Sequence, residues 1–385
     1  MDNLISFEKL GDTCIYLVLI LVNISYCPGI IMTSNYRVLM SIIIGIIFLT
    51  LAINIKHKLF FALSLYLYYG VFALLVCCIA FLTSGIFILD ATYNIFLTIT
   101  CFLLGYCCKN QTLSFIYRCM KVNILSALFL GLFSVFTNLG GFVISEQYAF
   151  SVKNSSGVLL GIAIVLCAFV IKESNVKCST ALWWVVMFLL AVCLLTFRCR
   201  TVIISVTMCL IYFLYKNNIL YRLLQPIILL YIISIIILLN IFNLSPIGYI
   251  YDSLFSNTNV NDLNSVTSGR LDTYDIGWQV FSESPMFGNK LMHRSIPPVD
   301  NFIIGNLTFY GVVGALLLFP PYFYTWYICL KGLWHQSISN LIPFCTLFLI
   351  CMSSFTEGSF PFGPGTPVIC SWFLLGWWYN FKRIE

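Results

Sequence analysis

Long apolar runs repeat through almost the whole of this chain, and they constrain its fold more than any other feature. Twelve can be counted, at residues 13–31, 38–55, 59–82, 93–108, 122–136, 157–171, 180–197, 201–215, 223–242, 309–330, 338–355 and 367–381. A helix of about 20 apolar residues crosses the hydrocarbon core of a bilayer. The chain is 61% hydrophobic and 9% charged, which is not the composition of a soluble domain. The sequence therefore predicts an all-α polytopic membrane protein, with about 12 transmembrane helices in a single integral membrane domain over residues 1–385.

The basic residues between these runs predict the orientation, because cytoplasmic loops carry an excess of lysine and arginine. Placing the N-terminus inside puts thirteen of the 20 basic residues inside, namely Lys9, Lys56, Lys58, Lys109, Arg118, Lys121, Lys172, Lys177, Lys216, Arg222, Lys331, Lys382 and Arg383. Both termini are then cytoplasmic. The net charge of +6 is mostly this topology signal, and it does not indicate nucleic-acid binding.

One long polar interval, residues 243–301, interrupts the apolar pattern and falls outside the membrane in this orientation. It holds nine of the chain's 34 charged residues and none of its 17 cysteines. Within it, apolar residues recur at helical spacing, and they are Leu271, Tyr274, Trp278 and Phe281. Ser284-Pro285 should end this helix, since the residue before a proline avoids the helical region. We expect the four apolar side chains to be buried together, against the membrane domain or the lipid surface.

Arg270 falls in the first turn of that helix, where a cation is unfavourable for the helix dipole but can help to bind an anion. A plainer alternative is an amphipathic helix on the bilayer surface, with Arg270 touching lipid headgroups. Arg198 and Arg200 raise the same choice, because they lie at the outer end of one apolar run directly before the next. They could reach lipid phosphates. A pair of guanidinium groups on the same side as Arg270 favours an anionic ligand, because guanidinium is planar and binds phosphate bidentately.

The cysteines are scattered within or at the ends of the apolar runs, and no CxxC pair faces a second one. This distribution argues against a zinc site and against a disulfide framework. We interpret the cysteines as small hydrophobic core residues.

Four further external features carry polar groups, each with an ordinary structural explanation. Lys153-Asn154-Ser155-Ser156-Gly157 precedes a span and could be a capping loop. Glu357 is the lone charge of the last external loop, and His293 lies in the large loop. Asp300-Asn301 directly precedes an apolar segment and could cap a helix.

Taken in order, these residues resemble the family of O-antigen polymerases and ligases over about the last two thirds of the chain. Phe197-Arg198-Cys199-Arg200-Thr201 resembles the "S-R-T" junction between two helices of that family. Ser268-Gly269-Arg270 with Ser284-Pro285…Gly288 resembles its "G-R…P-x-x-G" loop. Asp300-Asn301…Gly311-Val312-Val313-Gly314 resembles its "H-N…G-x-x-G" sequence before a late helix. Lys153-Asn154…Gly157 and Glu357…Trp372…Leu375-Gly376 fit looser positions.

The resemblance implies a multi-pass protein of the bacterial inner membrane whose 243–301 loop is periplasmic. It implies metal-independent glycosyl transfer, without a cofactor, from an undecaprenyl-diphosphate-linked oligosaccharide. By position, Arg200 and Arg270 would bind the donor diphosphate, with Arg198 assisting. A base would complete the chemistry, and Asp300, His293 and Glu357 are the candidates. Membrane lipid and a chain-length regulator protein are the other expected partners, and no nucleic acid is expected.

The chain departs from the ligase pattern at Asp300, where ligases carry a histidine, and this departure favours a polymerase. The leading hypothesis is therefore a polymerase that joins lipid-linked repeat units into O-antigen or a similar surface polysaccharide. The alternatives are a ligase that transfers polysaccharide to the lipid A core, and a flippase for lipid-linked oligosaccharide. A transporter would be expected to show internal repeats and charges near the bilayer midplane, and the sequence shows neither.

Overall fold

The computed structural model describes residues 2–31, 34–54, 59–84, 89–143, 153–173, 177–218, 248, 250–251, 262–267, 269–289, 296–297, 299–336, 340–358, 360–362 and 367–384. Within these ranges the regular structure is helical throughout, and no strand occurs. The predicted all-α class is thus confirmed for the described part of the chain. Of the predicted 243–301 loop, only scattered parts are described.

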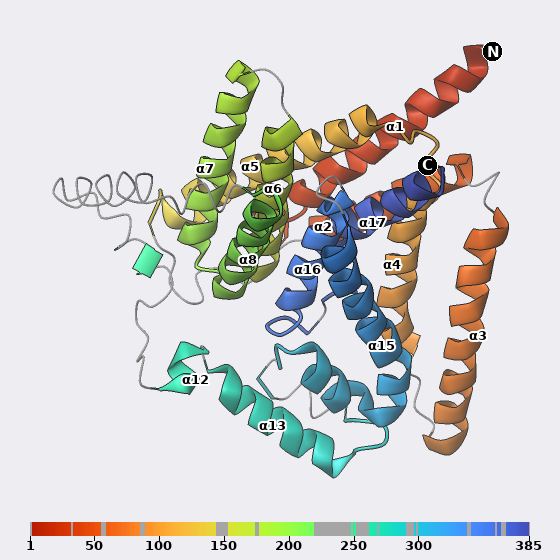
Figure 1. The fold of residues 1–385 in the computed structure, drawn as a ribbon. Helices are drawn as coiled ribbons and strands as arrows, with labels where there is room; N and C mark the ends of the chain where they lie inside the picture. Colours follow the sequence, from red (N-terminus) through yellow and green to blue (C-terminus); the bar gives the residue numbers. More distant parts are fainter. Residues whose placement is uncertain are drawn as a thin grey trace.

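The helices of the described part of the chain follow the apolar runs, except for α12 and α13, which lie in the polar interval (Figure 1). They are α1 (Asp2–Ile24), α2 (Ser34–Asn54), α3 (Leu59–Ser84), α4 (Leu89–Tyr106), α5 (Leu113–Leu139), α6 (Lys153–Glu173), α7 (Lys177–Phe197), α8 (Arg200–Lys216), α12 (Leu263–Val266), α13 (Arg270–Glu283), α15 (Phe302–His335), α16 (Ile342–Ser353) and α17 (Pro367–Ile384). A helix stands at eleven of the twelve predicted spans, and the span predicted at 223–242 lies outside the described residues.

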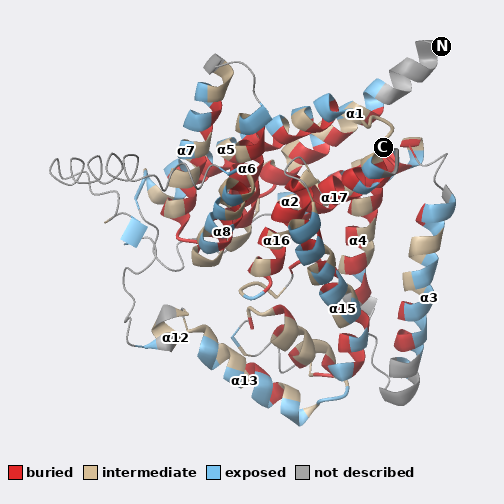
Figure 2. Cartoon of the chain, in the orientation of Figure 1, coloured by how far each residue is buried: buried red, intermediate tan, exposed pale blue. Residues whose placement is uncertain are grey.

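Six of these helices are long and apolar enough to cross a membrane, namely α2, α3, α5, α6, α7 and α15. Two more, α4 and α16, are apolar but shorter. The protein therefore has several helices fit for a bilayer, and the total of twelve spans stays a prediction. Apolar side chains remain exposed on the outer helices, as on α3, where Phe60 and Tyr68 are 88% and 87% exposed. Figure 2 shows such exposed faces alongside buried ones on α3, as expected of a helix with one side in lipid.

Helix α6 forms the centre of the bundle and packs against α5, α7, α8 and α16. Nearly all its residues between Ser156 and Val170 are buried. Helices α4 and α17 approach each other so closely that a Cβ at Gly376 would clash with the Phe102 carbonyl oxygen. Small residues permit this kind of close backbone contact between apolar helices. Two glycines, Gly105 and Gly376, therefore determine the crossing of α4 and α17.

The described cysteines behave as the sequence predicted. Of the sixteen whose side chains the structure describes, all have free thiols and fourteen are buried. They fill the spaces between helices as small apolar side chains.

The two termini lie near each other at one end of the molecule, and α12 and α13 lie at the opposite end (Figure 1). The predicted topology places both termini on one side of the membrane and the 243–301 loop on the other. The side of the membrane on which each end lies remains a prediction.

Candidate functional site

The site begins at the junction of α7 and α8, where the chain reverses direction within two residues. Arg198 has a left-handed backbone, with φ of 57°, which is costly for any residue but glycine and often marks a functional position. The side chain of Arg198 is only 7% exposed. Cys199 follows as the N-cap of α8, and its thiol donates to the carbonyl oxygen of Lys153 at 3.1 Å. The first turns of α6 and α8 are thus held together.

A glycine makes this contact possible. A Cβ added at Gly157, one turn into α6, would lie 2.6 Å from the Cys199 sulfur. Such a separation is far below a normal contact, so only glycine lets the start of α6 approach the α7–α8 junction. The capping interpretation of the 153–157 segment was therefore incomplete, because this segment is part of the site's wall.

Helix α13 brings the third arginine. It begins at Arg270, after Gly269 in the left-handed conformation, and ends at Glu283 directly before Ser284-Pro285, as predicted. Its buried residues are Gly277 and Val280, and the carbonyl oxygen of Gly277 accepts a hydrogen bond from the Thr308 hydroxyl at 3.2 Å. Arg270 lies two turns before Gly277, so it heads the packed face of the helix.

The four apolar side chains of α13 are not buried together within the described part of the protein, and their predicted contact with the lipid surface stays a prediction. Leu271 and Trp278 are 38% and 54% exposed. The reason is Gly277: because it has no side chain, the helix packs closely against Val299 and Ile304 through the face that contains Gly277. Trp278 instead contacts Phe281, with ring centroids 5.2 Å apart.

Tyr274 connects α13 to the rest of the site. Its hydroxyl donates to the carbonyl oxygens of Phe355 at 2.8 Å and Asp300 at 3.3 Å. These two acceptors belong to the loop after α16 and to the residue before the N-cap of α15. The sequence predicted Tyr274 only as part of an apolar helix face. Its hydrogen bonds could not be predicted, because the sequence does not show which distant carbonyl groups will lie near its hydroxyl.

A break in α15 accepts the Ser284–Gly288 loop. At Gly311 the backbone leaves the helix, with φ of 64° and ψ of −166°. The N–H groups of Val312 and Val313 therefore donate to the carbonyl oxygens of Pro285 and Met286, at 2.9 and 3.0 Å. The carbonyl oxygen of Thr308, freed by the break, accepts from the N–H of Asn289 at 2.9 Å. Each of these backbone groups is satisfied although the helix is interrupted.

Two glycines make this docking possible. A Cβ at Gly288 would lie 2.6 Å from the carbonyl carbon of Phe309, and one at Gly311 would lie 2.5 Å from the backbone nitrogen of Gly288. The two glycine motifs of the sequence thus pack against each other backbone to backbone. They fix α13 relative to α15.

Asp300 and Asn301 divide two tasks. The side chain of Asn301 caps α15 by accepting from the N–H groups of Ile303 and Ile304, at 2.9 and 3.1 Å. The cap is therefore made by Asn301, and the carboxyl group of Asp300 belongs to the candidate site. Burial raises the pKa of its carboxyl group, and the charge of Arg270 acts in the opposite direction.

Glu357 lies in the loop after α16, which is tied to α15 by the hydrogen bond from the Phe302 N–H to the Ser354 carbonyl oxygen at 2.9 Å. Burial raises the pKa of Glu357 to about 7. A hydrogen bond from Asn154 lowers this pKa, the charge of Asp300 raises it, and the charge of Arg270 lowers it. Glu357 is therefore a carboxyl group that changes protonation near neutral pH.

The cations of the site act on one another. The charge of Lys153 interacts with those of Arg198, Arg200 and Arg270. Burial lowers the pKa of Arg200, and the charges of Arg198 and Arg270 lower it further. The Nε atom of Arg270 is buried without a hydrogen-bond partner in the described part of the chain. Mutual repulsion of this kind is relieved by an anion, and guanidinium groups suit phosphate.

The structure therefore brings together five of the six site residues expected from the sequence, namely Arg198, Arg200, Arg270, Asp300 and Glu357. The sixth, His293, lies outside the described residues. Two residues were not assigned to the site from sequence, Lys153 as a cation and Asn154 as a partner of Glu357. The available signal was the position of Lys153 among the few basic residues predicted to be external.

Several helices begin at this site. Lys153, Arg200 and Arg270 are the first residues of α6, α8 and α13, and Asp300 precedes α15 by two residues. The positive ends of these helix dipoles add to the side-chain charges. Among the described residues, no group of three or more histidine, cysteine, aspartate and glutamate side chains is arranged to hold a metal ion. The arrangement is suited to an anionic group beside a carboxyl group that can accept a proton.

No family model matches the chain, and no curated protein matches it.

Proposed function

We propose that the protein is a polymerase that joins polyprenyl-diphosphate-linked oligosaccharide units into O-antigen or a similar surface polysaccharide. The observation that supports this most is the mutual interaction of four cations, Lys153, Arg198, Arg200 and Arg270, beside the carboxyl group of Glu357. A lipid-linked donor presents a diphosphate at the membrane surface. The cations would bind this diphosphate and stabilise the charge that develops on it as it departs.

In this proposal an acceptor hydroxyl attacks the anomeric carbon of the donor sugar. The new C–O bond forms while the bond from that carbon to the diphosphate oxygen breaks, and the electron pair leaves with the diphosphate. The hydroxyl proton passes to a carboxylate. Three features favour Glu357 as this base: its pKa of about 7, its hydrogen bond to Asn154 and its place beside Arg270. A base is most effective when its pKa is near the working pH.

Asp300 has a second role in the proposal. Its negative charge raises the pKa of Glu357, so it keeps the base sufficiently basic. Its backbone carbonyl oxygen accepts from Tyr274 and so helps to hold α13, and with it Arg270, over the site. The alternatives, a ligase and a flippase, use the same lipid-linked diphosphate, and Asp300 at the histidine position of ligases is the feature that favours the polymerase.

The test is the polysaccharide ladder of a strain in which the gene is deleted. A polymerase predicts that the ladder disappears while a single repeat unit remains on the lipid A core. Loss of all repeat units from the core would mean a ligase or a flippase and would overturn the proposal. Complementation with the wild-type chain should restore the ladder.

A further inference from the structure

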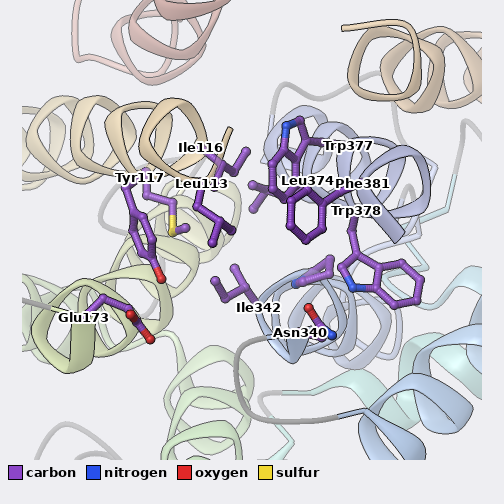
Figure 3. Close-up of a pocket in the computed structure, with 12 residues that line it drawn as sticks. Leu113, Ile116, Tyr117, Glu173, Asn340, Ile342, Leu374, Trp377, Trp378 and Phe381 are labelled. Atoms are coloured by element: carbon purple, nitrogen blue, oxygen red, sulfur yellow. The ribbon is translucent and has the colours of Figure 1, made fainter. Parts of the chain in front are cut away.

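A cavity lies at the other end of α6 from the candidate site. Its volume is about 160 Å³, and its walls come from the first turns of α5, the end of α6, the start of α16 and helix α17 (Figure 3). Lys153 begins α6 and Glu173 ends it. At 1.5 Å per residue, roughly 30 Å separates the two ends of this helix, which is about the thickness of the hydrocarbon core. The cavity is therefore at the opposite membrane boundary.

The cavity adjoins a wider hollow of about 550 Å³ that contains Arg118 and Lys121. Tyr117 and Glu173 line both, and the charge of Glu173 acts on the Tyr117 hydroxyl. Figure 3 shows these two residues across the cavity from Trp377 and Trp378. One carboxylate thus stands between an aromatic cavity and a pair of cations.

One wall of the cavity carries a polar group with no partner. Trp378 is only 7% exposed, and its ring N–H has no hydrogen-bond partner among the described residues. Its neighbour Trp377 donates its own ring N–H to the Asn110 carbonyl oxygen at 3.2 Å. Buried tryptophan N–H groups usually find an acceptor, and leaving one unpaired costs roughly 1–3 kcal/mol. A ligand in the cavity would supply the acceptor that Trp378 lacks.

These features select the chemistry of the ligand. Arg118 and Lys121 outweigh Glu173 by one positive charge, which matches a phosphodiester. A hydroxyl group can both donate to Glu173 and accept from Trp378, whereas an ammonium group can only donate. Aromatic walls suit the carbon backbone of a small polyol.

We infer that this cavity and the adjoining hollow bind the headgroup of an anionic phospholipid that carries a polyol, of the phosphatidylglycerol type. The phosphate contacts Arg118 and Lys121, and the glycerol hydroxyls contact Glu173 and Trp378. A lipid is favoured over a free phosphopolyol because the hollow is at the end of a candidate membrane span, α5. Leu113, on the cavity wall, is 52% exposed and offers an apolar surface to the acyl chains.

The test uses the full chain in detergent and measures bound lipid by native mass spectrometry. We expect phosphatidylglycerol to be retained over phosphatidylethanolamine and over phosphatidic acid, which has no polyol. Trp378→Phe removes one N–H donor and should weaken phosphatidylglycerol binding roughly threefold to tenfold. Arg118→Gln removes a charged contact with phosphate and should weaken it roughly tenfold to a hundredfold. Because Arg118 is exposed, this variant should fold normally.

Controls are Trp184→Phe and Lys172→Gln, which remove an indole N–H and a positive charge from exposed positions outside the cavity and the hollow. Both should bind phosphatidylglycerol as the wild type does. Equal retention of phosphatidylglycerol and phosphatidylethanolamine would overturn the inference, as would wild-type binding by Arg118→Gln. Displacement of the lipid by an equal concentration of free glycerol 3-phosphate would overturn the assignment to a lipid.

Discussion

The carboxylate of Glu357 accepts a hydrogen bond from the side chain of Asn154, which joins the loop after α16 to the first turn of α6. The adjacent residue, Lys153, has a charge that interacts with Arg198, Arg200 and Arg270. The start of α6 thus contacts both the acidic and the basic parts of the candidate site. Its position is fixed by the bond from the Cys199 thiol to the Lys153 carbonyl oxygen.

If Glu357 is the base, Glu357→Gln should lower the rate of polymerisation on the order of 100-fold or more, because an amide cannot accept the hydroxyl proton. The measurement is the turnover of lipid-linked repeat units by purified protein. Glu283→Gln, at an exposed position in the last turn of α13, is the matched control and should retain wild-type turnover. Wild-type turnover by Glu357→Gln would remove Glu357 from the mechanism.

The dependence of turnover on pH should reflect the ionisation of the Glu357 carboxyl group. Since the pKa of Glu357 is raised to about 7, the base is mostly protonated below that pH, and turnover should rise as pH increases through neutrality. Asn154→Ala removes a hydrogen bond that favours the ionised form, so the midpoint should move to higher pH. A profile of Asn154→Ala with the wild-type midpoint and only a lower plateau would mean that Asn154 serves merely to pack the site.

The arginines should not tolerate lysine. Arg200→Lys and Arg270→Lys keep the charge but lose the bidentate geometry, and each should abolish most chain elongation while the protein still accumulates in the membrane. Arg37→Lys, at an exposed position near the start of α2, is the control for an arginine outside the site. If either site variant produced polysaccharide of normal length, that arginine would be assigned to lipid headgroups.

The docking of the two glycine motifs predicts a structural effect. Gly311→Ala would place a Cβ 2.5 Å from the backbone nitrogen of Gly288 and would strain a left-handed residue, at a cost of about 1–3 kcal/mol for the strain alone. The thermal midpoint should fall, and protease should cut α13 faster. Gly45→Ala, in helix α2 with no atom within 4 Å of the new Cβ, should be neutral or slightly stabilising. Equal midpoints for the two variants would contradict the docking.

Topology can be tested with single cysteines in a variant lacking the native ones. Ser282 on α13 and Lys172 on α6 are both exposed and belong to opposite ends of the predicted topology. Ser282→Cys should react with an impermeant reagent in cells whose outer membrane is open, and Lys172→Cys only after the inner membrane is breached. The reverse pattern would invert the orientation.

The sequence by itself determined the helices and several of their limits. Apolar runs predicted a helix at eleven positions where the structure has one, because a long run of apolar residues is stable in a bilayer only as a helix with internally satisfied backbone groups. Ser284-Pro285 ends α13 at Glu283, and Arg270 stands in its first turn, since proline and capping rules are local. The order of the charged residues along the chain also indicated that Arg198, Arg200 and Arg270 could belong to one site.

Only the tertiary structure decided how those residues meet. The periodicity of α13 indicated an apolar stripe through Leu271 and Trp278, but the helix packs through Gly277, because close approach to α15 needs a missing side chain and not an apolar one. The break at Gly311 is stable only because the Ser284–Gly288 loop satisfies the freed backbone groups. The pKa of Glu357 likewise depends on burial and on distant partners, Asn154 among them. Such effects arise from atoms brought together by the fold, and no local pattern of residues encodes them.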